Sequence, residues 1–98
     1  MTANVTDPKL KVKQPRERLP SSMDFINVLD PGETIGTISL LQARPSGLTI
    51  ADQNIVGSKI IFWLSGGDDQ VTYHVEAAVQ TSIGATREAD GDLYVVDK

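Results

Sequence analysis

The segment SKIIFWLSGGDDQVTYHVEAAVQ, residues 58–80, decides the fold class of this chain. Its second half alternates without interruption between an apolar face and a polar face. The apolar face holds Val71, Tyr73, Val75, Ala77 and Val79, and the polar face holds Thr72, His74, Glu76 and Gln80. A period of two indicates a β-strand with one buried and one solvated side. We interpret Gly66-Gly67 as a hairpin turn that joins this strand to the apolar strand before it, Lys59 to Leu64.

Shorter apolar runs separated by turn residues continue this pattern along the chain. We expect further strands at 23–29, 34–41, 48–51 and 85–97, with an edge piece at 55–56 and a bulge in the second of these. In the last strand, Leu93 and Val95 should face inward. Regular short strands of this kind predict an all-β fold, an immunoglobulin-like antiparallel β-sandwich of about seven strands.

Several residues are assigned structural roles. Asp30-Pro31-Gly32-Glu33 fits a type II turn, whose third position requires a positive φ and therefore favours glycine. Thr81-Ser82-Ile83-Gly84 fits the turn before the last strand. Tyr73 lies near the start of the penultimate strand, where such sandwiches often carry a tyrosine whose hydroxyl bonds to nearby backbone. We expect Tyr73, Gly32, Gly66, Gly67 and Gly84 to serve the fold.

Length and composition limit the function classes. The 98 residues suit one small domain, and the absence of cysteine excludes disulfides and thiolate metal sites. No apolar run approaches the roughly 20 residues of a membrane helix. The first residues lack the basic and apolar regions of a signal peptide, so we expect the product to begin in the cytoplasm, with no membrane partner.

Charge divides the chain into two parts, which we interpret as a flexible, proline-rich basic arm at 1–20 and a sandwich domain at 21–98. The first part carries five cations against two acids, a net charge of +3, and the second carries four cations against eleven acids, a net charge of −7. The arm is a solvated leader, an element that orders on an assembly partner, or a nucleic-acid contact. The acidic domain disfavours the last alternative. The arm cations are Lys9, Lys11, Lys13, Arg16 and Arg18.

Enzymatic chemistry has little support in the sequence. The single histidine, His74, lies on the polar side of its strand and is expected to be solvated, without a nucleophile beside it. The acids Asp68-Asp69 and Asp90-Gly91-Asp92 occupy turn-like positions. Together with Asp52 they leave a calcium site open only if loops converge, because calcium needs six to eight oxygen ligands. We predict no catalytic residues, no metal, no cofactor and no small-molecule substrate.

Trp63 is the residue that best indicates an interaction. If Ile60, Phe62 and Leu64 face the core, then Ile61 and Trp63 face outward, and an exposed apolar patch marks an interface. Tyr94 and Val96 are predicted to extend this patch. Coverage by neighbouring side chains or by the leader is an equal alternative. A tryptophan platform for carbohydrate is a further one, although the chain holds only five aromatic residues.

The order of several short motifs resembles a group of small structural proteins of tailed bacteriophages and prophages. The matching elements are Gly32-Glu33-Thr34-Ile35, Gly47-Leu48-Thr49-Ile50, Phe62 to Gly67, Thr72-Tyr73, Thr81 to Gly84, Arg87 and Leu93-Tyr94-Val95.

The resemblance covers about residues 25–96 and implies an immunoglobulin-like sandwich that serves as a minor, non-enzymatic part of the virion. Its expected position is the head–tail junction, the tail or a fibre attachment. Its expected partners are other virion proteins or further copies of itself. Its expected location is the host cytoplasm during assembly and then the virion. The long proline-rich leader departs from the shorter starts of this group.

Overall fold

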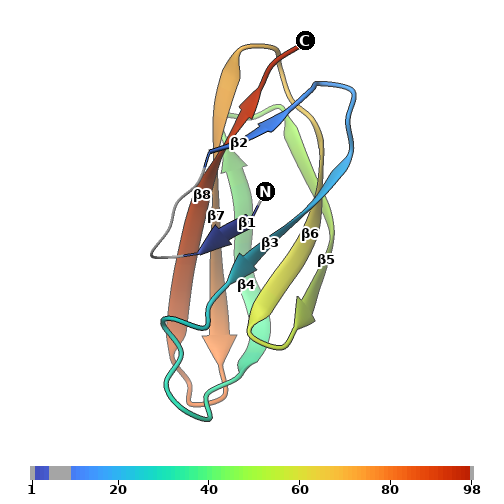
Figure 1. Ribbon diagram of the computed structural model, residues 1–98. Helices are drawn as coiled ribbons and strands as arrows, with labels where there is room; N and C mark the ends of the chain where they lie inside the picture. Colours follow the sequence, from blue (N-terminus) through green and yellow to red (C-terminus); the bar gives the residue numbers. More distant parts are fainter. Residues whose placement is uncertain (1, 5–9, 98) are drawn as a thin grey trace.

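Two packed β-sheets form the structure, a computed structural model that describes residues 2–4 and 10–97 (Figure 1). The described residues form eight strands: β1 Thr2–Asn4, β2 Leu10–Lys13, β3 Leu19–Asp24, β4 Ile35–Arg44, β5 Leu48–Val56, β6 Lys59–Gly66, β7 Val71–Thr81 and β8 Thr86–Val95. The first sheet has the order β1-β3-β6-β5 and the second has the order β2-β8-β7-β4. Neighbouring strands are antiparallel, except that β1 runs parallel to β3 and β2 runs parallel to β8. The all-β sandwich predicted from the sequence is confirmed.

The core lies between the sheets and consists of the inward residues of the central strands. On β6, Ile60, Phe62 and Leu64 are fully buried, as the alternation predicted. On β7 and β8 the buried set includes Tyr73, Val75, Ala77, Val79, Leu93 and Val95. Each of these strands therefore presents its alternate residues to the space between the sheets. None of the described segments is a helix with the length and apolarity to cross a membrane.

The hairpin predicted at Gly66-Gly67 is wrong, because β6 and β7 belong to different sheets. Positive φ angles at Gly66 (74°), Gly67 (98°) and Gln70 (63°) turn the chain from one sheet to the other. A Cβ at Gly67 would lie 2.8 Å from a methyl carbon of Val95, so the crossing passes close to the core. The hairpin partner of β7 is β8, joined through the predicted turn at residues 81–84.

The irregular arm predicted up to residue 20 is corrected for the part that the structure describes. Leu10–Lys13 form β2, paired with β8, and β3 begins at Leu19 and pairs with β6. The sheets supply hydrogen-bonding edges to a segment whose own composition does not predict strands. Lys9 lies outside the described residues.

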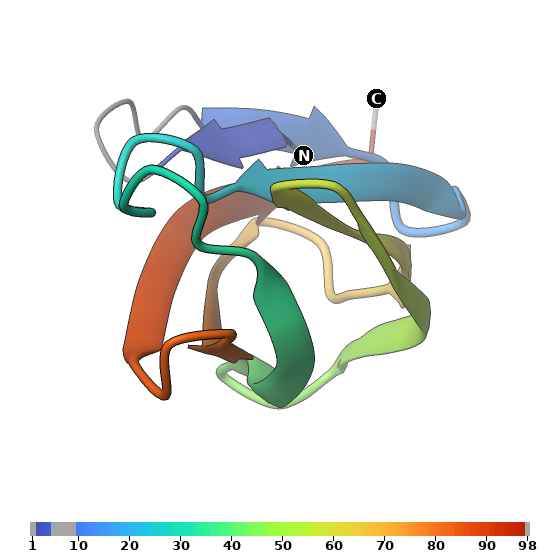
Figure 2. The ribbon, with the colours of Figure 1, turned by 90° about the horizontal axis from the view of Figure 1, so that it is seen from below.

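The strand predicted at 23–29 ends earlier than expected. β3 stops at Asp24, and Phe25 then enters the core while its carbonyl oxygen accepts from the N–H groups of Val28 and Leu29. Residues 25–34 therefore form a connection that passes from the first sheet to the second across one end of the sandwich (Figure 2).

The other local predictions are confirmed with small changes. The Glu33 N–H donates to the Asp30 carbonyl at 2.9 Å and Gly32 has a φ of 81°, as a type II turn requires. The strand predicted at 34–41 is β4, and its pairing with β7 shifts register twice, which is the predicted bulge. The pieces predicted at 48–51 and 55–56 form one strand, β5, with a register shift between Ala51 and Asn54.

Candidate interaction surfaces

The outer side of the first sheet carries an uncharged strip. Ile61 and Trp63 face outward from β6 and are half-buried, as the sequence predicted. In register with Trp63 lie Pro20 of β3 and Ala51 of β5, and in register with Ile61 lie Ser22 and Asn54. A shallow hollow is lined by Pro20, Ser21, Ser22 and Ile61. We call the outward residues Pro20, Ser22, Ala51, Asn54, Ile61 and Trp63 the Trp63 strip.

Arg18 covers part of Trp63. Its guanidinium carbon lies 4.3 Å from the centroid of the indole ring, and its Nη2 atom lies 2.5 Å from Oδ2 of Asp52. Both charged side chains are about half exposed or more, so the ion pair itself contributes little to stability. The covering of Trp63 from the N-terminal segment was one of the alternatives left open by the sequence. It occupies a ring face that a bound sugar would need, which weighs against a carbohydrate platform.

Tyr94 and Val96 do not join the Trp63 strip, so the predicted extension of the patch is wrong. Tyr94 faces outward from β8, which belongs to the second sheet, and the outer faces of two packed sheets point in opposite directions. The neighbour of Tyr94 on β2 is the exposed Val12. Val96 is half-buried beyond the end of β8, and its N–H donates to the Lys13 carbonyl at 2.9 Å.

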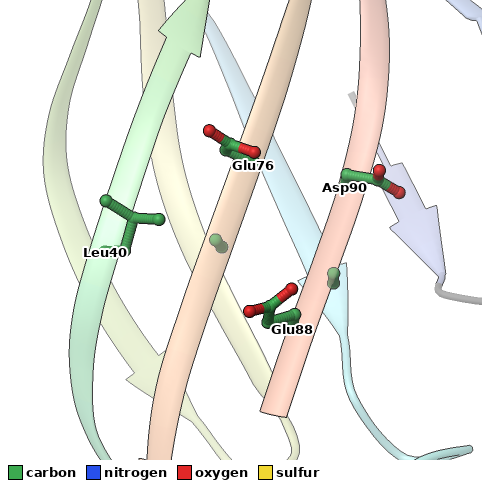
Figure 3. Close-up of a pocket in the computed structure, with 6 residues that line it drawn as sticks. Leu40, Glu76, Glu88 and Asp90 are labelled. Atoms are coloured by element: carbon green, nitrogen blue, oxygen red, sulfur yellow. The ribbon is translucent and has the colours of Figure 1, made fainter. Parts of the chain in front are cut away.

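The outer side of the second sheet is acidic. Outward positions along β7 and β8 hold Glu76, Glu88, Asp90 and Asp92. Figure 3 shows a hollow on this side, with the carboxylates of Glu76, Glu88 and Asp90 around it and Leu40 of β4 opposite them. This face is acidic and the Trp63 strip is uncharged. The two therefore fit partner surfaces of different charge.

Acidic side chains in these regions bond mostly to protein groups. His74 is partly exposed, and its ring lies between Asp92, 2.8 Å from Nδ1, and Asp90, 3.3 Å from Nε2. Glu76 accepts hydrogen bonds from Gln42 and Arg44. Asp69 accepts from the Asp97 N–H at 2.7 Å. Within residues 2–4 and 10–97, no group of three or more histidine and acidic side chains could hold a metal ion.

Most described cations of the N-terminal segment bond within the domain. Lys11 donates to the Pro20 carbonyl at 3.2 Å, and Arg18 pairs with Asp52. Lys13 is fully buried, and its Nζ atom donates to the carbonyl oxygens of Gln14, Pro15 and Gly66 at 2.7, 3.2 and 2.6 Å. Burial lowers the pKa of the Lys13 ammonium. Arg16 is exposed. Cations engaged in this way are poorly placed to neutralise a phosphate backbone.

Tyr73 is fully buried, and its hydroxyl oxygen accepts a hydrogen bond from the Asp68 N–H at 2.8 Å. The bond links β7 to the sheet crossing five residues upstream. Gly47 approaches the same hydroxyl, and a Cβ there would lie 2.8 Å from it, on a backbone with a φ of 123°. The side chain of Tyr73 thus joins two connections at one end of the sandwich.

The opposite end is closed by a buried carboxylate that the sequence interpretation did not single out. The Glu33 side chain has no exposed surface and accepts from Arg87 at 2.9 and 3.2 Å, from the Thr81 hydroxyl and from the Asp30 N–H. These bonds, that of Arg87 first, lower the pKa of Glu33 to about 2. Glu33 and Arg87 both belong to motifs of the phage resemblance. Their presence in these motifs was the sequence signal that could have singled them out.

The comparison with protein families identifies the chain. The family described as podophage GP4 fiber-tail adaptor protein gp77 matches residues 13–94, from the last residue of β2 almost to the end of β8. The chain belongs to this family. The adaptor is a structural component of a phage tail and not an enzyme, as the resemblance implied, and the tail is now favoured over the head–tail junction. A comparison with curated proteins found no match.

Proposed function

We propose that this adaptor joins a tail fibre to the tail through separate surfaces of one rigid sandwich, and that the Trp63 strip is one of them. The observation that carries the proposal is the family match over residues 13–94, which takes in both sheets rather than one loop or arm. The partners are accordingly a tail protein and a fibre protein.

The character of the Trp63 strip supports its part in this joint. Tryptophan is enriched among the residues that contribute most binding energy at interfaces, and Ile61 adds an aliphatic neighbour on the same strand. Arg18 restricts the orientation of the indole, so little side-chain entropy remains to be lost when a partner packs on it. Pro20 and Ser22 belong to the strip and carry no charge.

Other surfaces are secondary candidates. Tyr94 and Val12 form a small apolar pair on the opposite side, and Val96 lies nearby in the chain. Arg16, which is exposed, is a candidate for contact with an acidic neighbour, whereas the fully buried Lys13 is not. Because tail components repeat around a symmetry axis, contact between copies of the adaptor is also part of the proposal.

We also propose that the sandwich is of the immunoglobulin-like class. Two observations support this class. The strands β3, β6 and β5 form one sheet that packs against β8, β7 and β4 of the other, and the Asp68 N–H donates a hydrogen bond to the Tyr73 hydroxyl. The protein would fold in the host cytoplasm during assembly and then join the virion.

The test is genetic complementation of a phage that lacks the adaptor gene. Trp63→Ala and Ile61→Ser should give particles with at least tenfold fewer attached fibres, counted by electron microscopy, because each removes a central contact. Thr37→Ala, an exposed change on β4 of the second sheet, is the matched control and should leave the count unchanged. A normal fibre count with Trp63→Ala would remove the strip from the proposal.

A further inference from the structure

One side of the sandwich is open along the edge strands β4 and β5. Among the described residues, each of these strands pairs on one side only, β4 with β7 and β5 with β6. In Figure 2 the two strands lie at the same side of the sandwich, each as the last strand of its sheet. Every second residue of an edge strand directs its backbone N–H and C=O away from the sheet. These groups are free to pair with another extended chain.

The core is only partly covered along this open side. The inward apolar residues of the central strands β6, β7 and β8 are almost all buried. The apolar residues that β4 and β5 pack against the core are instead half-buried, and they are Ile38, Leu41, Ala43, Leu48, Ile50 and Ile55. An extended chain added at this side would remove part of their apolar surface from water, which is favourable.

The second half of β4 is a regular and uncharged edge. Both register shifts between β4 and β7 come before Leu40, and the pairing is then uninterrupted to Arg44. Protein edges are usually protected against strand addition by bulges, charges or proline. Residues 40–43, with the sequence LLQA, have none of these. We call residues 40–44 the β4 edge. Thr37 lies outside it, in the irregular first half of the strand.

β5 is a poorer template for an added strand. Its register with β6 shifts between Ala51 and Asn54, at the centre of the strand. Asp52, within this interval, has a left-handed φ of 55° and pairs with Arg18. A bulge and a charge therefore protect the middle of β5, so we assign strand addition to β4.

An acidic hollow lies beside the β4 edge. Leu40 borders it on the β4 side, and Glu76, Glu88 and Asp90 surround it from β7 and β8 (Figure 3). Among the described residues, the exposed Glu88 carboxylate has no ion pair or hydrogen bond. A strand added outside β4 would lie two strand spacings, about 10 Å, from β7. The long side chain of a lysine or arginine on that strand can reach over β4 toward the hollow.

We infer that the β4 edge accepts a terminal segment of the fibre protein as an added strand. This segment alternates aliphatic residues, which face inward beside Leu41 and Ala43, with lysine or arginine residues, which face outward toward the acidic hollow. The inference rests on the proposed adaptor function and specifies one contact within it. Strand addition needs a partner segment that is unpaired before binding. A fibre is attached by one of its ends, where a chain terminus can meet this need.

A second copy of this chain is a poorer occupant of the β4 edge. The cation that it would bring there, Arg44, already pairs with Glu76 of its own sheet. Its own carboxylates would add negative charge at the junction, and each copy carries a net charge of −4. The acidic hollow would therefore stay without a cation.

The first experiment measures amide hydrogen exchange of the full-length adaptor, alone and with purified fibre protein. Exchange should slow by about tenfold or more within residues 40–44, because an added strand supplies acceptors for the outward N–H groups of β4. Residues 48–51, on the edge strand β5, are the internal reference and should exchange as before. A fibre held only by side-chain contacts would leave exchange at both edges unchanged.

Glu88→Lys tests the charge of the occupant. The dissociation constant for purified fibre protein should rise by about tenfold, because the variant places a cation where the incoming cation binds. The matched control is Asp68→Lys, the same charge change at an exposed position in the β6–β7 connection, which should leave the constant within about twofold. Thermal unfolding is the folding control. Should Glu88→Lys unfold early, Glu88→Gln is compared with Asp68→Asn, and a rise of about threefold is expected for Glu88→Gln alone.

The outcomes separate the inference from the proposed function. If the unmodified adaptor binds neither the fibre protein nor phage particles that lack the adaptor, the proposed function fails. If it binds the particles only, or binds the fibre with unchanged exchange at residues 40–44, the inference fails and the function stands. Equal affinities of Glu88→Lys and Asp68→Lys would also overturn the inference. Slowed exchange at residues 40–44 in concentrated adaptor alone would make a second copy the occupant and overturn it as well.

Discussion

The carboxylate of Glu33 and the guanidinium of Arg87, separated by 54 residues in the chain, form a two-bond ion pair that closes one end of the sandwich. Glu33 belongs to the connection between the sheets and Arg87 to the start of β8. The Thr81 hydroxyl completes the network from β7. This pair therefore fixes the connection between the sheets against β7 and β8 of the second sheet.

Arg87→Ala should lower the thermal unfolding midpoint clearly. It leaves the fully buried Glu33 carboxylate without its strongest donor, and an unpaired buried charge is costly. The matched control is Arg44→Ala, which breaks the exposed pair between Arg44 and Glu76 and should change the midpoint by only a small fraction of that amount. The check is calorimetry on both variants. Equal midpoints for the two variants would show that the Glu33 pair is no stronger than a surface pair.

The Glu33 network also predicts an acid-sensitive stability. The pKa of Glu33 is lowered from 4.5 to about 2 in the folded protein, so the unfolded state binds more protons between these values. The contribution of Glu33 is full above about pH 4.5 and is lost as the pH falls toward 2. Unfolding midpoints measured from pH 6 to pH 2 should fall more steeply for the unmodified protein than for Glu33→Gln. Parallel curves would assign the acid sensitivity to other carboxylates.

Lys13→Met should destabilise the fold by about 1–3 kcal/mol, the range for leaving buried acceptors without a donor. The Lys13 ammonium is the shared donor for the carbonyls of Gln14, Pro15 and Gly66, and methionine preserves only the length of the side chain. Lys11→Met, which removes one bond to Pro20 at a more exposed position, should cost within about 0.5 kcal/mol. Urea unfolding of the two variants compares them directly. If Lys13→Met loses no more stability than Lys11→Met, water molecules donate to the three carbonyls in place of the ammonium.

Tyr73 and Gly47 should behave as a coupled pair. Tyr73→Phe removes the bond from the Asp68 N–H and should cost about 0.5–1.5 kcal/mol. Gly47→Ala should cost more, because its Cβ meets the Tyr73 hydroxyl on a left-handed backbone. In the double variant the hydroxyl is gone, so the combined loss should be smaller than the sum of the single losses. Strict additivity in a urea unfolding cycle would show that backbone strain alone sets the cost at Gly47.

The sequence predicted the parts of the fold that depend on local pattern. The alternation from Val71 to Val79 places side chains on faces whatever the strand pairs with, and the turn at Gly32 follows from its own residues. The same alternation does not specify which sheet a strand joins, so Gly66-Gly67 suited a hairpin equally well. Pattern also did not reveal the strand at Lys13, since its partners are supplied by distant parts of the chain.

The candidate surfaces divide in the same way. That Trp63 faces outward follows from the period of β6, and the structure agrees. That Arg18 lies on its ring, and that Tyr94 faces the opposite side, depend on sheet assignments that no local pattern contains.

Removing Arg18 should expose Trp63 with little effect on stability. Arg18→Ala removes an exposed ion pair and a cation–π contact, which together contribute on the order of 1 kcal/mol or less. The chain has a single tryptophan, so its fluorescence reports on this ring alone. Emission should shift to longer wavelength, and quenching by acrylamide should increase, while the unfolding midpoint changes only slightly. Asp52→Asn is the matched control, since it removes the ion pair and leaves the guanidinium over the ring. An Arg18→Ala spectrum identical to that of the unmodified protein would show that Arg18 does not cover Trp63 in solution.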